Sequence, residues 1–118
     1  MRGWKLATGA AMLAMAVPVA AQDLGTPAEN LDCAVWASVI TGTTDDPEVA
    51  QGFGYVMSWF IGLYEGATGT RIDEAMAVRI AQIDDAEFEA IGERCAPRMG
   101  AFGTRLGELG RRLQAQGN

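Results

Sequence analysis

The chain contains two cysteines, Cys33 and Cys95, and they constrain its fold more than any other feature. Cysteines of exported proteins form disulfides, and two cysteines allow only one pairing. The bond would close a loop of about 60 residues, worth roughly 4 kcal/mol of unfolding free energy in the chain-entropy estimate. The chain has no Cys-x-x-Cys motif and no histidine, which excludes Cys/His zinc sites and Cys–His catalysis. The sequence therefore predicts a structural Cys33–Cys95 disulfide.

Residues 1–21 have the three parts of an export signal. Arg2 and Lys5 precede an apolar stretch from Leu6 to Val17, and small residues lead up to a cleavage site after Ala21. The stretch is short for a membrane span of about 20 residues, although an uncleaved amino-terminal anchor is the alternative. We expect a signal peptide over 1–21, a periplasmic or secreted protein, and one helical domain over 22–118 with no stable membrane span after cleavage.

The charge of the expected mature chain is acidic and unevenly distributed. After cleavage it would carry seven arginines and no lysine against fifteen carboxylates, which argues against nucleic acid as a partner. Residues 22–70 contain seven acidic residues and no basic one, whereas residues 94–118 contain five arginines and one glutamate. Either the two ends pack together and complement each other, or the basic tail binds an anion or a protein partner.

Four segments of the mature chain have helical patterns. Thr26 and Glu29 form a capping-box pattern before a helix over 27–41. Asp46, Thr70 and Asp84 are candidate N-caps of three further helices, which we expect over 48–65, over 71–83 and from residue 85 onward.

Apolar residues of the last helix recur at spacings of three and four, which is typical of a bundle seam. They are Phe88, Ile91, Cys95, Met99, Phe102, Leu106, Leu109 and Leu113. Pro97 lies within this run and should kink the helix, because proline removes a backbone hydrogen bond. The sequence thus predicts an all-α fold, a small four-helix bundle with the disulfide joining its first helix to a last helix kinked near Pro97.

Small residues recur every four positions along the expected second helix, at Ala50, Gly54, Ser58, Gly62 and Gly66. Such a stripe lets another backbone approach closely. The approaching backbone could belong to a neighbouring helix of the same domain, to a second copy of the chain, or to a membrane helix. Tyr55 and Trp59 share a helix face and have polar tips that suit a surface. The candidate interaction surface is Gly54, Tyr55, Ser58, Trp59 and Gly62.

Catalytic and metal-binding residue types are scarce. Without histidine and, after cleavage, lysine, only carboxylates remain as general acids or bases. Acidic clusters at 45–48 and 84–89 lack the ligand spacing of a calcium loop and coincide with expected helix starts, where capping explains them. We therefore expect no catalytic, cofactor or metal site.

Three stretches carry a resemblance to other proteins. Residues 32–37 (Asp-Cys-Ala-Val-Trp-Ala), residues 64–69 (Tyr-Glu-Gly-Ala-Thr-Gly) and Cys95 before an Arg/Leu/Gly-rich helix resemble small uncharacterised exported proteins of alphaproteobacteria, especially sphingomonads. That resemblance implies no function. The two cysteines, apolar helices and carboxylate excess are also loosely similar to the HdeA-type periplasmic acid-stress chaperones, and this similarity transfers no functional residue.

Three functions are compatible with these features. The first is a non-enzymatic interaction or structural role in the cell envelope, with either a second copy of the chain or another envelope protein as partner. The second is an acid-activated holdase, because carboxylates paired with arginine lose that stabilisation when they are protonated near pH 4. The third is a small-ligand-binding module formed by the aromatic residues.

Overall fold

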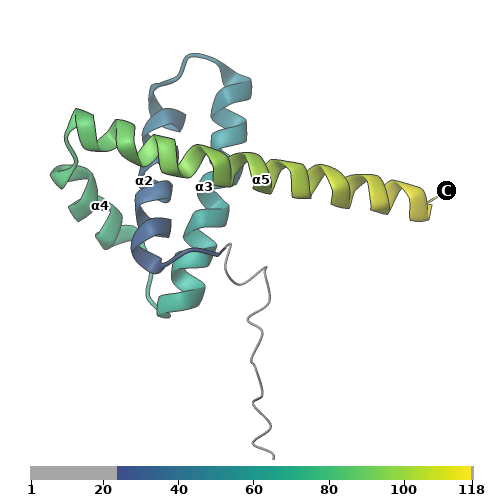
Figure 1. Cartoon of the computed structure of the whole chain (residues 1–118), viewed down its shortest axis with the longest axis horizontal. Helices are drawn as coiled ribbons and strands as arrows, with labels where there is room; N and C mark the ends of the chain where they lie inside the picture. The colour runs from purple at the N-terminus through teal and green to yellow at the C-terminus, as the bar shows by residue number, and fades with distance from the viewer. Residues whose placement is uncertain (1–23, 118) are drawn as a thin grey trace, which may run out of the picture.

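The computed structural model describes residues 24–117, and these residues form four α-helices and no strand (Figure 1). The helices are α2 (Pro27–Thr43), α3 (Pro47–Thr68), α4 (Asp73–Gln82) and α5 (Asp85–Gly117). The expected all-α, four-helix architecture is confirmed. The expected signal peptide lies outside the described residues.

Three of the predicted helix starts are present. The amide of Glu29 donates to the Thr26 hydroxyl and the amide of Thr26 donates to the Glu29 carboxylate, each over 3.2 Å, so the capping box of α2 is complete. The Asp46 carboxylate accepts from two amides in the first turn of α3. Asp84 accepts a 2.7 Å bond from the amide of Glu87 at the start of α5. In each case a side chain satisfies amides that lack a helical partner.

The prediction for α4 is wrong at its start. Thr70 is not the N-cap, and α4 begins at Asp73, with no side-chain cap bond. Instead, the amide of Ile72 donates over 3.0 Å to the Glu65 carboxylate at the end of α3, and the Ile72 side chain is only 2% exposed. Burial of Ile72 and this longer-range bond determine the turn, because they outweigh a local cap.

Helices α2 and α3 form a hairpin, and α5 crosses both of them (Figure 1). Trp36 of α2 packs edge-on against Phe53 of α3, with ring centroids 5.1 Å apart. Gly92 makes the crossing of α5 over α2 close, since a methyl group there would lie 2.8 Å from Trp36 Nε1. Phe60 of α3 and Ile91 of α5 are fully buried in the shared core.

The predicted disulfide is present between Cys33 of α2 and Cys95 of α5, with Cα atoms 5.5 Å apart. Both cysteines are buried within the hydrophobic core. The covalent bond therefore holds α5 at the point where it crosses α2.

The seam predicted for the last helix is correct only in its first half. Helix α5 is continuous through Pro97, and its apolar residues as far as Phe102 belong to the core cluster or pack against it. Every residue of 103–117 is exposed, including Leu106 (45%), Leu109 (52%) and Leu113 (59%). The 33-residue helix crosses the shorter α2 and α3 rather than lying along them, so its end has no neighbour in the described chain. A kink at Pro97 stays a prediction.

We call residues 103–117 the C-terminal arm. It extends away from the other helices as a single helix (Figure 1). Across residues 24–117, none of the helices combines the length and apolarity that a membrane crossing requires.

Candidate functional site

The candidate surface predicted on α3 lies at the outside of the molecule, and we call it the α3 patch (Gly54, Tyr55, Ser58, Trp59 and Gly62). Tyr55 is 61% exposed, and its hydroxyl accepts a 3.1 Å bond from the Gln51 side chain. Ser58 and Gly62 are exposed, whereas Gly54 and Trp59 are half-buried. The patch therefore combines polar tips with small side chains.

Among residues 24–117, no helix covers the glycines of the small-residue stripe. A methyl group on Gly54, Gly62 or Gly66 would meet no neighbouring atom within 4 Å among the described residues. Within the part of the chain that the structure describes, the expectation of a neighbouring helix on this stripe is therefore wrong. Helix α2 packs against another side of α3, where Trp36 meets Phe53, and α5 reaches the edge of the α3 patch at Trp59.

The arm begins beside the α3 patch. Phe102, the last half-buried residue of α5, stacks on Trp59 with ring centroids 4.4 Å apart and an interplanar angle of 8°. The Arg98 guanidinium lies 5.0 Å from the Phe60 ring centroid and 5.8 Å from that of Trp59. Together, cation–π attraction and stacking hold α5 on α3 at the point where the arm begins.

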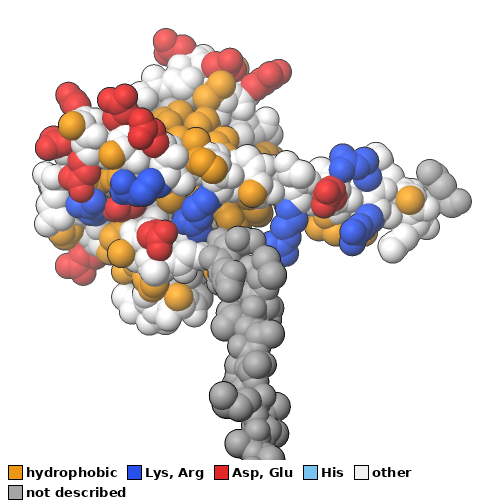
Figure 2. All heavy atoms as spheres, viewed as in Figure 1, with side chains coloured by type: hydrophobic (Ala, Val, Ile, Leu, Met, Phe, Trp, Pro, Cys, Tyr) orange, Lys and Arg blue, Asp and Glu red, His pale blue; other side chains and the backbone are white. Residues whose placement is uncertain are grey.

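The arm and the remaining helices have opposite charge. The arm carries Arg105, Arg111 and Arg112 against Glu108, whereas residues 24–101 carry thirteen carboxylates and four arginines. Figure 2 shows acidic side chains spread over the helical body and blue arginines along the arm. Within residues 24–117, none of the arm's arginines forms an ion pair. Among the described residues, the one ion pair between the two ends joins Arg94 and Asp32, 3.8 Å apart.

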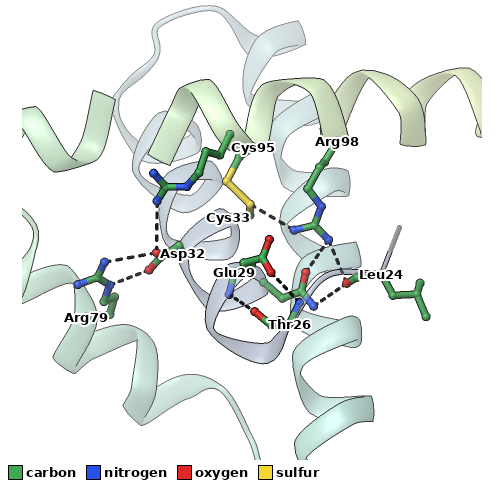
Figure 3. Close-up of a disulfide and its surroundings, with 10 residues drawn as sticks. Leu24, Thr26, Glu29, Asp32, Cys33, Arg79, Cys95 and Arg98 are labelled. Carbon is green, nitrogen blue, oxygen red and sulfur yellow. Dashed lines mark hydrogen bonds and ion pairs between the residues drawn. A yellow bond between two sulfur atoms is a disulfide. The ribbon is translucent and has the colours of Figure 1, made fainter. Parts of the chain in front are cut away.

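A buried polar cluster surrounds the disulfide (Figure 3). Arg98 donates over 2.7 Å to the side-chain oxygen of Asn30, over 3.1 Å to the carbonyl of Leu24, and over 3.6 Å to Cys33 Sγ. Asn30 is 1% exposed and donates to the same Leu24 carbonyl over 2.9 Å. Burial lowers the pKa of Arg98, since removal from water disfavours the charged guanidinium.

The cluster also holds the first described residues, Leu24 and Gly25, against Arg98. Gly25 has a φ of +70°, and a methyl group on it would lie 2.9 Å from Arg98 Nη2. Glycine is thus required here both for its backbone conformation and for the close approach of Arg98. Sequence reasoning missed Asn30 and Arg98. Each lies three residues from a cysteine, and that spacing places them on the disulfide face of their helices.

A second ionic cluster joins three helices. Arg79 of α4 contacts Asp32 of α2 over 2.7 Å and Glu87 of α5 over 2.6 Å. Hydrogen bonds to Asp32 and then Glu87 raise the pKa of Arg79, because both carboxylates favour its charged form. Sequence reasoning missed this cluster, since Arg79 and Asp32 are 47 residues apart and no local pattern pairs them.

The acidic clusters fulfil the capping role expected of them at Asp46 and Asp84. Within residues 24–117, no group of three or more carboxylates or cysteines is arranged to hold a metal ion. An open groove of about 440 Å³ lies between α4 and the facing parts of α2 and α3, lined by residues that include Leu31, Tyr64 and Val78. This groove is the described feature in which a small ligand could bind, as the small-ligand hypothesis requires.

Comparisons with other proteins add no assignment. No family model, no curated protein and no solved structure matches this chain.

Proposed function

We propose that this chain is an exported, non-enzymatic protein of the cell envelope that binds another polypeptide through the C-terminal arm and the α3 patch. The observation that carries the proposal is the apolar face of the arm. Leu106, Leu109 and Leu113 continue the spacing of the packed half of α5, yet they are about half exposed.

The energetics favour a partner on this face. An apolar face on one side of a helix is normally buried against another element. Burying the exposed half of each arm leucine would contribute about 1 kcal/mol to binding, before the cost of association. The α3 patch adjoins the root of the arm through the Trp59–Phe102 stack, so a partner on the arm can also contact the patch.

Composition and the amino-terminal sequence support the other parts of the proposal. Residues 1–21 have the pattern of an export signal, and two cysteines that pair suit an oxidising compartment. The sequence contains no histidine, and its single lysine, Lys5, lies within the expected signal. These compositions favour a binding role over acid–base catalysis.

A site-specific crosslinking experiment in cells tests the proposal. A photo-crosslinking amino acid at Leu109 should form a discrete adduct with a protein, whereas the same group at the exposed Glu89 should not. Changing both Leu106 and Leu113 to glutamine should remove the adduct. Equal or absent crosslinking at positions 109 and 89 would contradict the proposal.

The Arg79 cluster favours a second candidate, an acid-activated holdase. Arg79 joins α4 to α2 and α5 through ion pairs with Asp32 and Glu87, and loss of these pairs would release α4. Release of α4 would expose Ile72 and the core beneath it. Circular dichroism and client-aggregation assays at pH 7 and pH 3 test this candidate.

The holdase candidate predicts client protection at pH 3 and partial protection by Arg79→Gln already at pH 7. Arg71→Gln is the matched control, because Arg71 is exposed and its ion pair within residues 24–117 is with its near neighbour Asp73. An unchanged near-UV signal and no client protection at pH 3 would exclude the candidate.

A further inference from the structure

We infer that the partner of the C-terminal arm is a second copy of this chain, in a two-fold dimer in which each arm lies across the α3 patch of the other copy. The inference rests on the proposed function, because it uses the same surface and specifies what occupies it. Three observations carry it: the continuity of the apolar face, the charge of the arm, and the open face of α3.

The apolar face of the arm is continuous with an interface that already exists within the chain. Met99 and Phe102 pack against the α2–α3 hairpin, and Leu106, Leu109 and Leu113 continue the same face of the same helix. The arm leaves the body beside α3 (Figure 1). In the proposed two-fold dimer each arm continues this apolar face onto the α3 side of the other copy.

Charge favours another copy of this chain over an anionic membrane. The arm is basic and the body, with thirteen carboxylates against four arginines, is strongly acidic. The opposite net charges of arm and body therefore attract each other, although the carboxylates of α3, Glu48 and Glu65, lie at its two ends rather than within the α3 patch. An anionic lipid surface would attract the arm but repel the body that carries it.

Charge also argues against the pairing of two arms with each other. Arg105 directly precedes Leu106 and Arg112 directly precedes Leu113, so both arginines border the apolar face of the arm on the same side. The residues that follow Phe102 and Leu109, on the other side of that face, are glycines and carry no charge. In an antiparallel pair the two arginines of one arm would lie beside those of the other. A pair of arms would thus bring like charges together, whereas the acidic body offers carboxylates.

The α3 patch can accept a helix. Side chains at Ser58 and Gly62 are small and exposed, and a methyl group on Gly62 meets no described atom within 4 Å. Small residues let two helices approach closely. Trp59 and Tyr55 border this space and supply apolar area with polar tips.

Sedimentation equilibrium of the exported protein, purified with its disulfide intact over a concentration series, tests the inference. We expect a reversible dimer of twice the chain mass, weakened by added salt because the basic arm and the acidic body of the other copy attract each other through their net charges. Leu109→Gln should weaken dimerisation by about tenfold or more. Gly62→Leu should also weaken it, since the larger side chain fills the space that the arm occupies.

Val78→Gln is the matched control, because Val78 is as exposed as Leu109 but lies on α4, outside the proposed interface. It should leave the dimer unchanged. Far-UV circular dichroism of each variant checks that the monomer still folds.

Three results would overturn the inference. One is a monomer at every concentration. In that case, an in-cell adduct between Leu109 and a different protein would still support the proposed function. A dimer that resists Gly62→Leu and strengthens with salt would indicate pairing between arms. A monomer that binds anionic vesicles through the arm would identify a membrane surface instead.

Discussion

Phe102 lies flat against Trp59, with ring centroids 4.4 Å apart and ring planes 8° from parallel. Phe102 is the last residue of α5 that packs against the core cluster, and every residue from 103 to 117 is exposed. It therefore separates the half of α5 that stabilises the fold from the half that is available to a partner.

Replacing Phe102 with alanine should destabilise the protein by about 2 kcal/mol, through lost stacking and lost apolar burial. Leu106→Ala is the control, one turn further along α5. It should change stability by no more than about 0.5 kcal/mol, because Leu106 is exposed in the monomer. Urea unfolding, measured at dilute concentration and followed by tryptophan fluorescence, checks both values. Equal effects of the two changes would mean that the packed part of α5 does not end at Phe102.

Reduction of the Cys33–Cys95 disulfide should lower the unfolding free energy by about 4 kcal/mol, because the bond closes a long loop in the unfolded chain. Thermal unfolding with and without reductant measures the effect, and the Cys33→Ala/Cys95→Ala variant should reproduce it. A thermal midpoint that hardly moves would show that the helices hold together without the bond.

Arg98→Met should cost about 2 kcal/mol of stability, since it leaves the buried oxygen of Asn30 without its donor and removes one of the two donors to the Leu24 carbonyl. Arg98→Lys should recover little, because one ammonium group cannot reproduce the spread of the guanidinium contacts. Arg111→Met is the control on the exposed arm and should be close to neutral. Denaturant unfolding of the three variants distinguishes these outcomes.

Acid should weaken the start of α2 through Glu29. Hydrogen bonds with the Thr26 side chain and then the Thr26 backbone hold the pKa of Glu29 below its ordinary value of 4.5. Because the pKa of Glu29 is lower in the folded chain than in the unfolded chain, its ionised form stabilises the fold above pH 4.5. This stabilisation is lost as the pH falls through the folded-state pKa.

Glu29→Gln keeps a neutral acceptor for the capping box at every pH. The wild-type chain should therefore be more stable than Glu29→Gln at pH 7, and the difference should disappear in the most acidic samples. Urea unfolding from pH 7 to pH 3 measures the difference. A difference that stays constant with pH would contradict the role given to Glu29.

Gly62→Ala should stabilise the monomer by up to about 1 kcal/mol, because alanine favours helix and its methyl group has open space. Gly92→Ala is the opposite case, since its methyl group would lie 2.8 Å from Trp36 Nε1 and should destabilise the protein. Thermal unfolding of dilute samples compares the two. Stabilisation by both changes would mean that α5 does not approach Trp36 closely.

Local chemistry could be predicted well. The caps at Thr26, Asp46 and Asp84 depend on residues within one helical turn, so a short stretch of sequence contains everything that determines them. The cap at Thr70 failed because Ile72 is buried and Glu65 bonds its amide, and both effects come from packing. The disulfide needed no knowledge of distance, since two cysteines have one pairing.

The candidate site was only partly predictable. The residues of the α3 patch could be named from their spacing, but spacing alone does not tell whether a small-residue face is covered. The contacts of Arg79 with Asp32 and of Arg98 with Asn30 join residues far apart in the chain, which no periodicity reveals.

By itself, the sequence determined the helical class, most helix starts, the disulfide and the amphipathic face of the last helix, because these follow from composition and from neighbours one or two turns away. Only the tertiary structure decided which part of that face is buried. Helix α5 crosses the hairpin instead of lying along it, so Phe102 packs on Trp59 while Leu106, Leu109 and Leu113, with the same spacing and polarity, stay exposed. Periodicity specifies that a helix has an apolar side, whereas the length and direction of its neighbours specify how far that side is covered.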